Sequence, residues 1–101
     1  MNLKEEQDWL YELYSEKKQE MYDGIRSVVL NAENSTVKLK GREWEYTNLL
    51  GKLCRKKFIE LYIDADYECI VKFADDKGEW ESELWHFNID EMYFMIDDME
   101  V

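Results

Sequence analysis

The prediction of the fold rests first on residues 58–87, which read FIELYIDADYECIVKFADDKGEWESELWHF. Apolar and polar residues alternate through most of it, which is the period of a β-strand with one buried face. Two breaks divide it, at Asp64–Asp66 and at Asp75–Gly78, and the second has the composition of a tight turn. The sequence therefore predicts a three-stranded antiparallel meander, with its last strand over residues 79–87.

The C-terminal segment, residues 89–99, fits two patterns. Alternate apolar residues from 92 to 96 suit a strand, whereas the wider spacing across the whole segment suits one face of a helix. Asn88 is followed three residues later by Glu91, as in a helix capping box. The capping pair favours a short helix, with a strand as the open alternative.

The N-terminal segment has the pattern of an amphipathic helix, with charged residues between apolar ones. Gly24 interrupts this pattern, so the helix is predicted to end near Asp23. The β-branched pair Val28–Val29 beyond it fits either a continuation of the helix or a strand. The apolar residues of the predicted helix face are Leu3, Leu10, Leu13, Tyr14, Met21 and Ile25.

The middle of the chain is predicted to form a β-hairpin and then a second helix. Residues 37–46 alternate on both sides of Lys40–Arg42, which favours a turn there. Apolar residues at helical spacing follow over residues 49–54, and the basic run Arg55–Lys57 suits a helix C-terminus. Together the segments predict an α+β fold in one domain over residues 1–101.

The charge of the chain is unevenly divided along its length. Residues 1–57 contain 10 acidic and 11 basic residues, whereas residues 58–101 contain 14 acidic and two basic residues. The two halves carry net charges of +1 and −12, and the whole chain −11. A segregated charge creates a directional field that attracts a basic partner. Residues 58–101 are therefore the predicted binding half.

Three glutamates form the centre of the predicted binding surface. Glu79, Glu81 and Glu83 alternate along one predicted strand, so their carboxylates project from one face about 6.8 Å apart. Phosphates of one DNA strand are about 3.4 Å apart along the helix axis, so the carboxylates match every second phosphate. The other candidate partner-binding residues are acidic or aromatic: Asp64, Asp66, Glu68, Asp75, Asp76, Tyr62, Tyr67, Trp80 and Trp85.

A simpler interpretation of the same residues is that they are an ordinary solvated surface. Carboxylates on a strand discourage edge-to-edge pairing, and alternating aromatics usually belong to a core. For each glutamate alone this interpretation is the stronger one. The cluster as a whole favours a function, because so many like charges in 44 residues repel one another.

Other kinds of site find little support in the sequence. His86 is the only histidine and no nucleophile motif lies near it, so catalysis is not expected. Cys54 and Cys69 lack metal-binding spacing and are expected to be reduced thiols. No glycine-rich phosphate loop occurs, and Cys69 stands where an EF-hand loop needs glycine. No metal or cofactor is predicted.

The net charge and the N-terminal sequence also limit the kinds of partner and the cellular compartment that we expect. A net charge of −11 disfavours direct binding to nucleic acid or to anionic membranes. The acidic N-terminus is unlike a secretory signal, and no apolar run is long enough to span a bilayer. We expect a cytoplasmic protein, in a bacterial host cell if a phage encodes it.

In size and charge the chain resembles the small acidic inhibitors of phages and mobile elements, including anti-restriction and anti-CRISPR proteins, some of which mimic DNA. This resemblance implies a non-catalytic inhibitor that binds a basic nuclease or other nucleic-acid-binding protein and blocks its nucleic-acid site. Immunity proteins that neutralise nuclease toxins have the same composition and are one alternative. A homodimeric structural or assembly module, with the aromatics in its interface, is the other.

Overall fold

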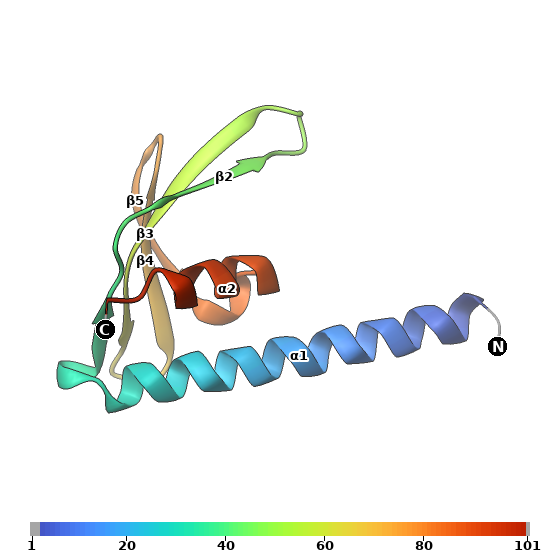
Figure 1. Ribbon diagram of the computed structural model, residues 1–101, viewed down its shortest axis with the longest axis horizontal. Coiled ribbons are helices and arrows are strands. Elements are labelled where there is room, and N and C mark those ends of the chain that lie inside the picture. Colours follow the sequence, from blue (N-terminus) through green and yellow to red (C-terminus); the bar gives the residue numbers. More distant parts are fainter. Residues whose placement is uncertain (1–2, 101) are drawn as a thin grey trace.

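The computed structural model describes the backbone of residues 3–100 and the side chains of residues 9–100. Figure 1 shows a long helix beside a twisted antiparallel sheet, with a short C-terminal helix next to both. The fold is α+β, as predicted. The helices are α1 (Leu3–Asn31) and α2 (Ile89–Asp97), and the strands are β1 (Thr36–Lys38), β2 (Glu43–Thr47), β3 (Leu53–Ile63), β4 (Cys69–Asp75) and β5 (Gly78–Glu83).

Helix α1 is longer than predicted. It continues through Gly24 to Asn31, so the predicted end near Asp23 is wrong and the alternative of a continuing helix is confirmed. Ile25 and Val29 are both buried, four residues apart on the same face as Met21. Their burial outweighs the roughly 1 kcal/mol by which glycine disfavours a helix interior relative to alanine.

The predicted hairpin at Lys40–Arg42 is wrong. β1 and β2 do not pair with each other, and both pair with β3, along the same edge. The break between them is held by Asp98, which is fully buried. Its carboxylate accepts hydrogen bonds from the Gly41 backbone N–H (3.0 Å) and from Arg42 Nε (2.7 Å). The chain therefore kinks at this point and continues in the same direction.

The predicted helix over residues 49–57 is also wrong, because this segment forms a turn and the start of β3. The side-chain oxygen of Asn48 accepts hydrogen bonds from the backbone N–H groups of Leu50 and Lys52. Gly51 has a φ of 75°, a conformation that glycine adopts without strain. The true hairpin is thus β2–β3, and the basic run Arg55–Lys57 lies in a strand.

The predicted meander is confirmed as β3, β4 and β5, joined in antiparallel order. The turn after Asp75 is also confirmed, since Asp75 pairs with Gly78 across it. The last strand ends at Glu83, four residues earlier than predicted, and residues Leu84–His86 form a 3-10 helix, η2. β5 is an edge of the described sheet, because β4 is its only neighbour there.

The C-terminal helix is confirmed together with its cap. The Asn88 side chain accepts a hydrogen bond from the Glu91 N–H (2.8 Å), and the Glu91 carboxylate accepts one from the Asn88 N–H (3.3 Å). α2 then presents Met92 and Met95 to the interior, where both are fully buried.

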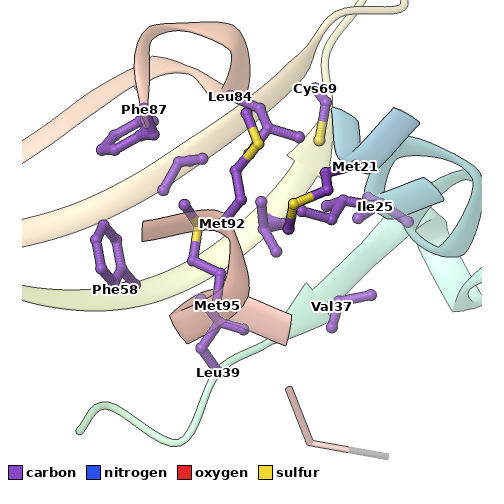
Figure 2. Close-up of a cluster of buried hydrophobic side chains, with 13 residues drawn as sticks. Met21, Ile25, Val37, Leu39, Phe58, Cys69, Leu84, Phe87, Met92 and Met95 are labelled. Carbon is purple, nitrogen blue, oxygen red and sulfur yellow. The ribbon is translucent and has the colours of Figure 1, made fainter. Parts of the chain in front are cut away.

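The core lies between one face of the sheet and the two helices (Figure 2). Phe58 is fully buried and meets the ring of Phe87 edge to face at 5.7 Å. Cys69 is fully buried as well, and burial raises the pKa of its thiol to about 11. The buried set is Met21, Ile25, Val29, Val37, Leu39, Phe58, Leu61, Cys69, Val71, Leu84, Phe87, Met92 and Met95.

Candidate partner-binding surface

The glutamate row lies on the free edge strand of the sheet. Glu79, Glu81 and Glu83 are all exposed and alternate along β5. Alternation places the three carboxylates on one face of the strand, about 6.8 Å apart. This is the face opposite the helices, since their partners in the register, Ala74, Lys72 and Ile70, alternate with the buried Val71.

Cations from neighbouring strands lie opposite some of these acids. Lys72 is paired in register with Glu81 on one side and with Glu60 on the other, and Glu60 is paired with Lys38. One row across the sheet therefore alternates in charge. The acidic row is bordered by a lysine at its middle but not at its ends, where Ala74 and Ile70 lie opposite Glu79 and Glu83.

Tyr62 holds the side chain of Glu81, the middle glutamate of the row, in position. Its hydroxyl donates a hydrogen bond to the Glu81 carboxylate over 2.9 Å. Burial and this hydrogen bond raise the pKa of Tyr62 above its usual value. Tyr62 therefore orients an acid of the row, and it is only half-exposed itself.

The β3–β4 turn carries the next acidic group. Asp64 accepts hydrogen bonds from the backbone N–H groups of Asp66 and Glu68, both over 2.9 Å, so its carboxylate builds the turn. Asp66 and Glu68 are exposed, and so is Tyr67, at 70%. The Arg26 guanidinium of α1 donates to the Tyr67 carbonyl over 2.8 Å, which attaches the turn to the helix.

The β4–β5 turn is acidic but lies among cations. Asp75 accepts hydrogen bonds from Trp80 Nε1 (3.0 Å) and from the Lys77 N–H (2.8 Å), and these donors lower its pKa. Asp75 and Asp76 line a shallow cavity of about 300 Å³ together with residues 55–57 of β3. This end of the surface is therefore mixed in charge.

The register shows how the acidic groups are arranged. The two turns lie at opposite ends of β4, so Asp64, Asp66 and Glu68 are not brought together with Asp75 and Asp76. β5 runs between the turns, with Glu83 at one end and Glu79 at the other. Of these acids, Glu79, Glu81 and Glu83 follow the β5 edge of the sheet.

The two predicted tryptophans have different environments. Trp80 is half-exposed and hydrogen-bonded to Asp75. Trp85 packs on α1, where Lys18 Nζ lies 4.5 Å from the ring centre and the Tyr22 ring meets it edge to face at 5.6 Å. Trp80 is the more available for a partner, and Trp85 holds the helix in place.

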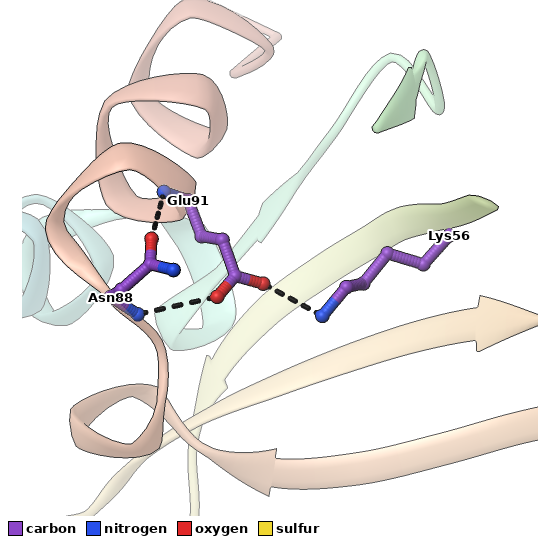
Figure 3. A network of polar contacts seen from close by, with 3 residues as sticks. All are labelled: Lys56, Asn88 and Glu91. Atoms are coloured by element: carbon purple, nitrogen blue, oxygen red, sulfur yellow. Dashed lines mark hydrogen bonds and ion pairs between the residues drawn. The ribbon is translucent and has the colours of Figure 1, made fainter. Parts of the chain in front are cut away.

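Two ion pairs that are at least partly buried were missed by the sequence reasoning. Lys56 Nζ lies 2.7 Å from the Glu91 carboxylate. Figure 3 shows that this carboxylate also accepts a hydrogen bond from the Asn88 backbone N–H. The Lys56 and Glu91 side chains are 17% and 10% exposed. The second pair is Arg42 with Asp98. The capping spacing signalled one partner, Glu91, but no local pattern signalled its lysine.

A serine–histidine contact is also present. Ser82 Oγ lies 3.0 Å from Nδ1 of His86, and Glu83 lies 3.9 Å from the other ring nitrogen. A hydroxyl and an imidazole at this distance resemble a nucleophile and its base. The imidazole is on the exposed surface, however, and the three residues come from one short segment. The absence of catalysis stays a prediction.

In the part of the chain that the structure describes, no three His, Cys, Asp or Glu side chains form a group that could hold a metal ion. Neither of the described α-helices is both long and apolar enough to cross a membrane. Comparison of the chain with protein-family models, curated proteins and solved structures gives no match.

Proposed function

We propose that this chain is a non-catalytic inhibitor that docks its β5 edge on a basic nucleic-acid-binding protein, such as a nuclease, and blocks its nucleic-acid site. The observation that carries the proposal is the line of exposed carboxylates Glu79, Glu81 and Glu83 on a free sheet edge. The acidic turn residues Asp66 and Glu68 extend this line beyond Glu83.

Inhibition would work by direct competition. A nuclease groove binds phosphates through lysine and arginine side chains, and carboxylates at about twice the phosphate spacing satisfy the same cations. The net charge of −12 on residues 58–101 would also accelerate association at low salt. Tyr67, exposed in the β3–β4 turn, and Trp80, exposed on the other face of β5, would supply apolar contacts beside the row. An immunity protein against a nuclease toxin would use the same surface.

The first test compares a charge-reversed row with a matched control. Wild type, Glu79→Lys/Glu81→Lys/Glu83→Lys and the control Glu33→Lys/Asp97→Lys/Glu100→Lys are immobilised and exposed to bacterial lysate. The control changes net charge equally at three exposed positions outside β5. We expect a basic nucleic-acid-binding protein on wild type and control, eluting as NaCl rises, and none on the row variant.

The second test measures competition with nucleic acid. The captured protein is mixed with fluorescent duplex DNA, and wild type is added. Displacement of the DNA by wild type and by the control variant, but not by the row variant, is the expected result. Equal capture by all three chains, or a ternary complex that still holds DNA, would rule out the proposed mechanism.

A further inference from the structure

The first half of α1 projects beyond the rest of the molecule, as Figure 1 shows. The body of the protein contacts α1 at Lys17, whose Nζ lies 6.0 Å from the ring centre of Tyr93 in α2, and at Lys18, which lies over Trp85. Residues 3–16, which we call the arm, extend from there for about 21 Å of helix.

The arm carries a large apolar surface that the described chain leaves bare. Leu10 is 58% exposed and Leu13 is 44% exposed, and three aromatic side chains beside them are also exposed. Soluble proteins rarely expose a contiguous cluster of this kind unless another surface covers it. A projecting helix also gains most of its stability from packing of its apolar face. The five residues are Trp9, Leu10, Tyr11, Leu13 and Tyr14.

The leucines lie on a seam with coiled-coil spacing. Positions 3, 6, 10, 13 and 17 are separated alternately by three and four residues, which is the a/d spacing of a two-helix contact, and leucine stands at 3, 10 and 13 with a charged residue at 6 and 17. Lys17 lies near Tyr93 of α2, and among the residues whose side chains are described the buried part of α1 begins at Met21. The positions that continue this spacing, 20, 24 and 27, are exposed, so the described body of the chain does not cover the seam.

We propose that a second copy of this chain covers the arm, with the two α1 helices antiparallel. In the register that opposes Leu10 of one copy to Leu13 of the other, Lys17 comes level with position 6 of the second copy, a glutamate in the sequence. The centre of the contact is then apolar and both ends are complementary in charge. A parallel pairing would oppose Lys17 to Lys17 and Glu16 to Glu16.

The charge of the whole chain supports the same orientation. Each copy has a net charge of −11, and residues 58–101, which belong to the body rather than to the arm, carry a net charge of −12. An antiparallel pairing places the two bodies at opposite ends of the paired arms. A parallel pairing would place them side by side, where their repulsion is strongest.

The oligomeric state tests the proposal. Sedimentation equilibrium of the full chain over about 1–300 µM is expected to give a dimer. Leu10→Glu/Leu13→Glu should raise the dimer dissociation constant at least about a hundred-fold, because four leucines per dimer become charged. Leu49→Glu/Leu50→Glu changes two exposed leucines at the β2–β3 turn by the same charge and should leave it unchanged.

Salt separates this contact from the acidic binding surface. The dimer should persist in about 1 M NaCl, because apolar burial is not screened. A wild type that stays monomeric throughout the concentration range would overturn the proposal. So would a loss of dimer in the Leu49/Leu50 control that matches the loss in the arm variant. Circular dichroism and the unfolding midpoint of each variant establish that it is folded.

Orientation is measured by a spin label at residue 28. Val28→Cys in a Cys54→Ser background leaves one accessible thiol, because Cys69 is fully buried. The proposed register separates the two labelled positions by 33 helical residues along the paired axis, about 50 Å. A dipolar spectrum centred near that distance supports the antiparallel dimer, and one near about 10 Å overturns it.

Discussion

Asp98 is the residue on which the β1–β2 connection depends. It follows α2 directly, is fully buried, and bonds through its carboxylate to both Gly41 and Arg42. Its own carbonyl accepts a hydrogen bond from the Lys40 N–H over 2.8 Å. One side chain therefore joins the C-terminal helix to a loop 57 residues earlier in the chain.

Removing this carboxylate should destabilise the whole fold. We expect Asp98→Ala to lower the free energy of unfolding by about 2–3 kcal/mol, because the Gly41 N–H loses its acceptor and the site keeps a cavity. The value lies at the low end for a broken buried pair, since Arg42 is 53% exposed and can be hydrated. Urea unfolding followed by tryptophan fluorescence measures the change.

The neighbouring aspartate is the matched control. Asp97 is exposed, so Asp97→Ala should change stability by less than about 0.5 kcal/mol. Similar effects of the two substitutions would mean that the buried contacts of Asp98 do not hold the loop.

At the level of elements, Gly24 lowers the stability of helix α1. Gly24 lies inside the helix, and a Cβ atom built there meets nothing within 4 Å. Gly24→Ala should therefore stabilise the protein by about 0.5–1 kcal/mol, raising the melting temperature by several degrees. Thermal unfolding followed at 222 nm tests this.

Gly41 provides the opposite case. It also has open space around its Cα, but its φ is 81°, which an L-residue with a Cβ adopts only under strain. Gly41→Ala should be destabilising by about 1 kcal/mol. If both substitutions move the melting temperature in the same direction, backbone conformation is not what distinguishes the two glycines.

Elements with strong local signals were predicted correctly from the sequence. The meander follows from alternation and from the turn after Asp75, and α2 follows from the capping pair Asn88 and Glu91. The errors fall where a distant contact or a side-chain hydrogen bond decides the structure. Asp98 converts the expected hairpin into a kink, and Asn48 builds a turn where the leucine spacing indicated a helix.

The candidate surface was predictable to the same extent. Alternation alone places Glu79, Glu81 and Glu83 on one face of a strand, and the structure has them there. That Lys72 lies opposite Glu81 depends on the register of β4 and β5, which becomes visible only when strands are paired. The separation of the two acidic turns by the length of β4 has the same origin.

At the scale of the whole molecule, folding mixes charges that the sequence separates. Two acids of the C-terminal half, Glu91 and Asp98, are paired with cations of the N-terminal half. Lys38 lies opposite Glu60 in the sheet. In these contacts, cations of residues 1–57 neutralise some of the carboxylates of residues 58–101. The β5 edge has no strand beyond it in the described sheet, so its carboxylates keep an excess of negative charge.

If that excess is uncompensated, salt should stabilise the folded protein. Screening weakens the mutual repulsion of the exposed carboxylates more than it weakens the two partly buried ion pairs, so the urea midpoint should rise as NaCl is added. Glu79→Gln/Glu81→Gln/Glu83→Gln removes three of the charges and should be more stable than wild type at low salt, with a smaller response to NaCl. A midpoint that falls with salt would mean that attraction between opposite charges dominates the molecule. The β5 edge would then lack the field that the proposed docking on a basic partner requires.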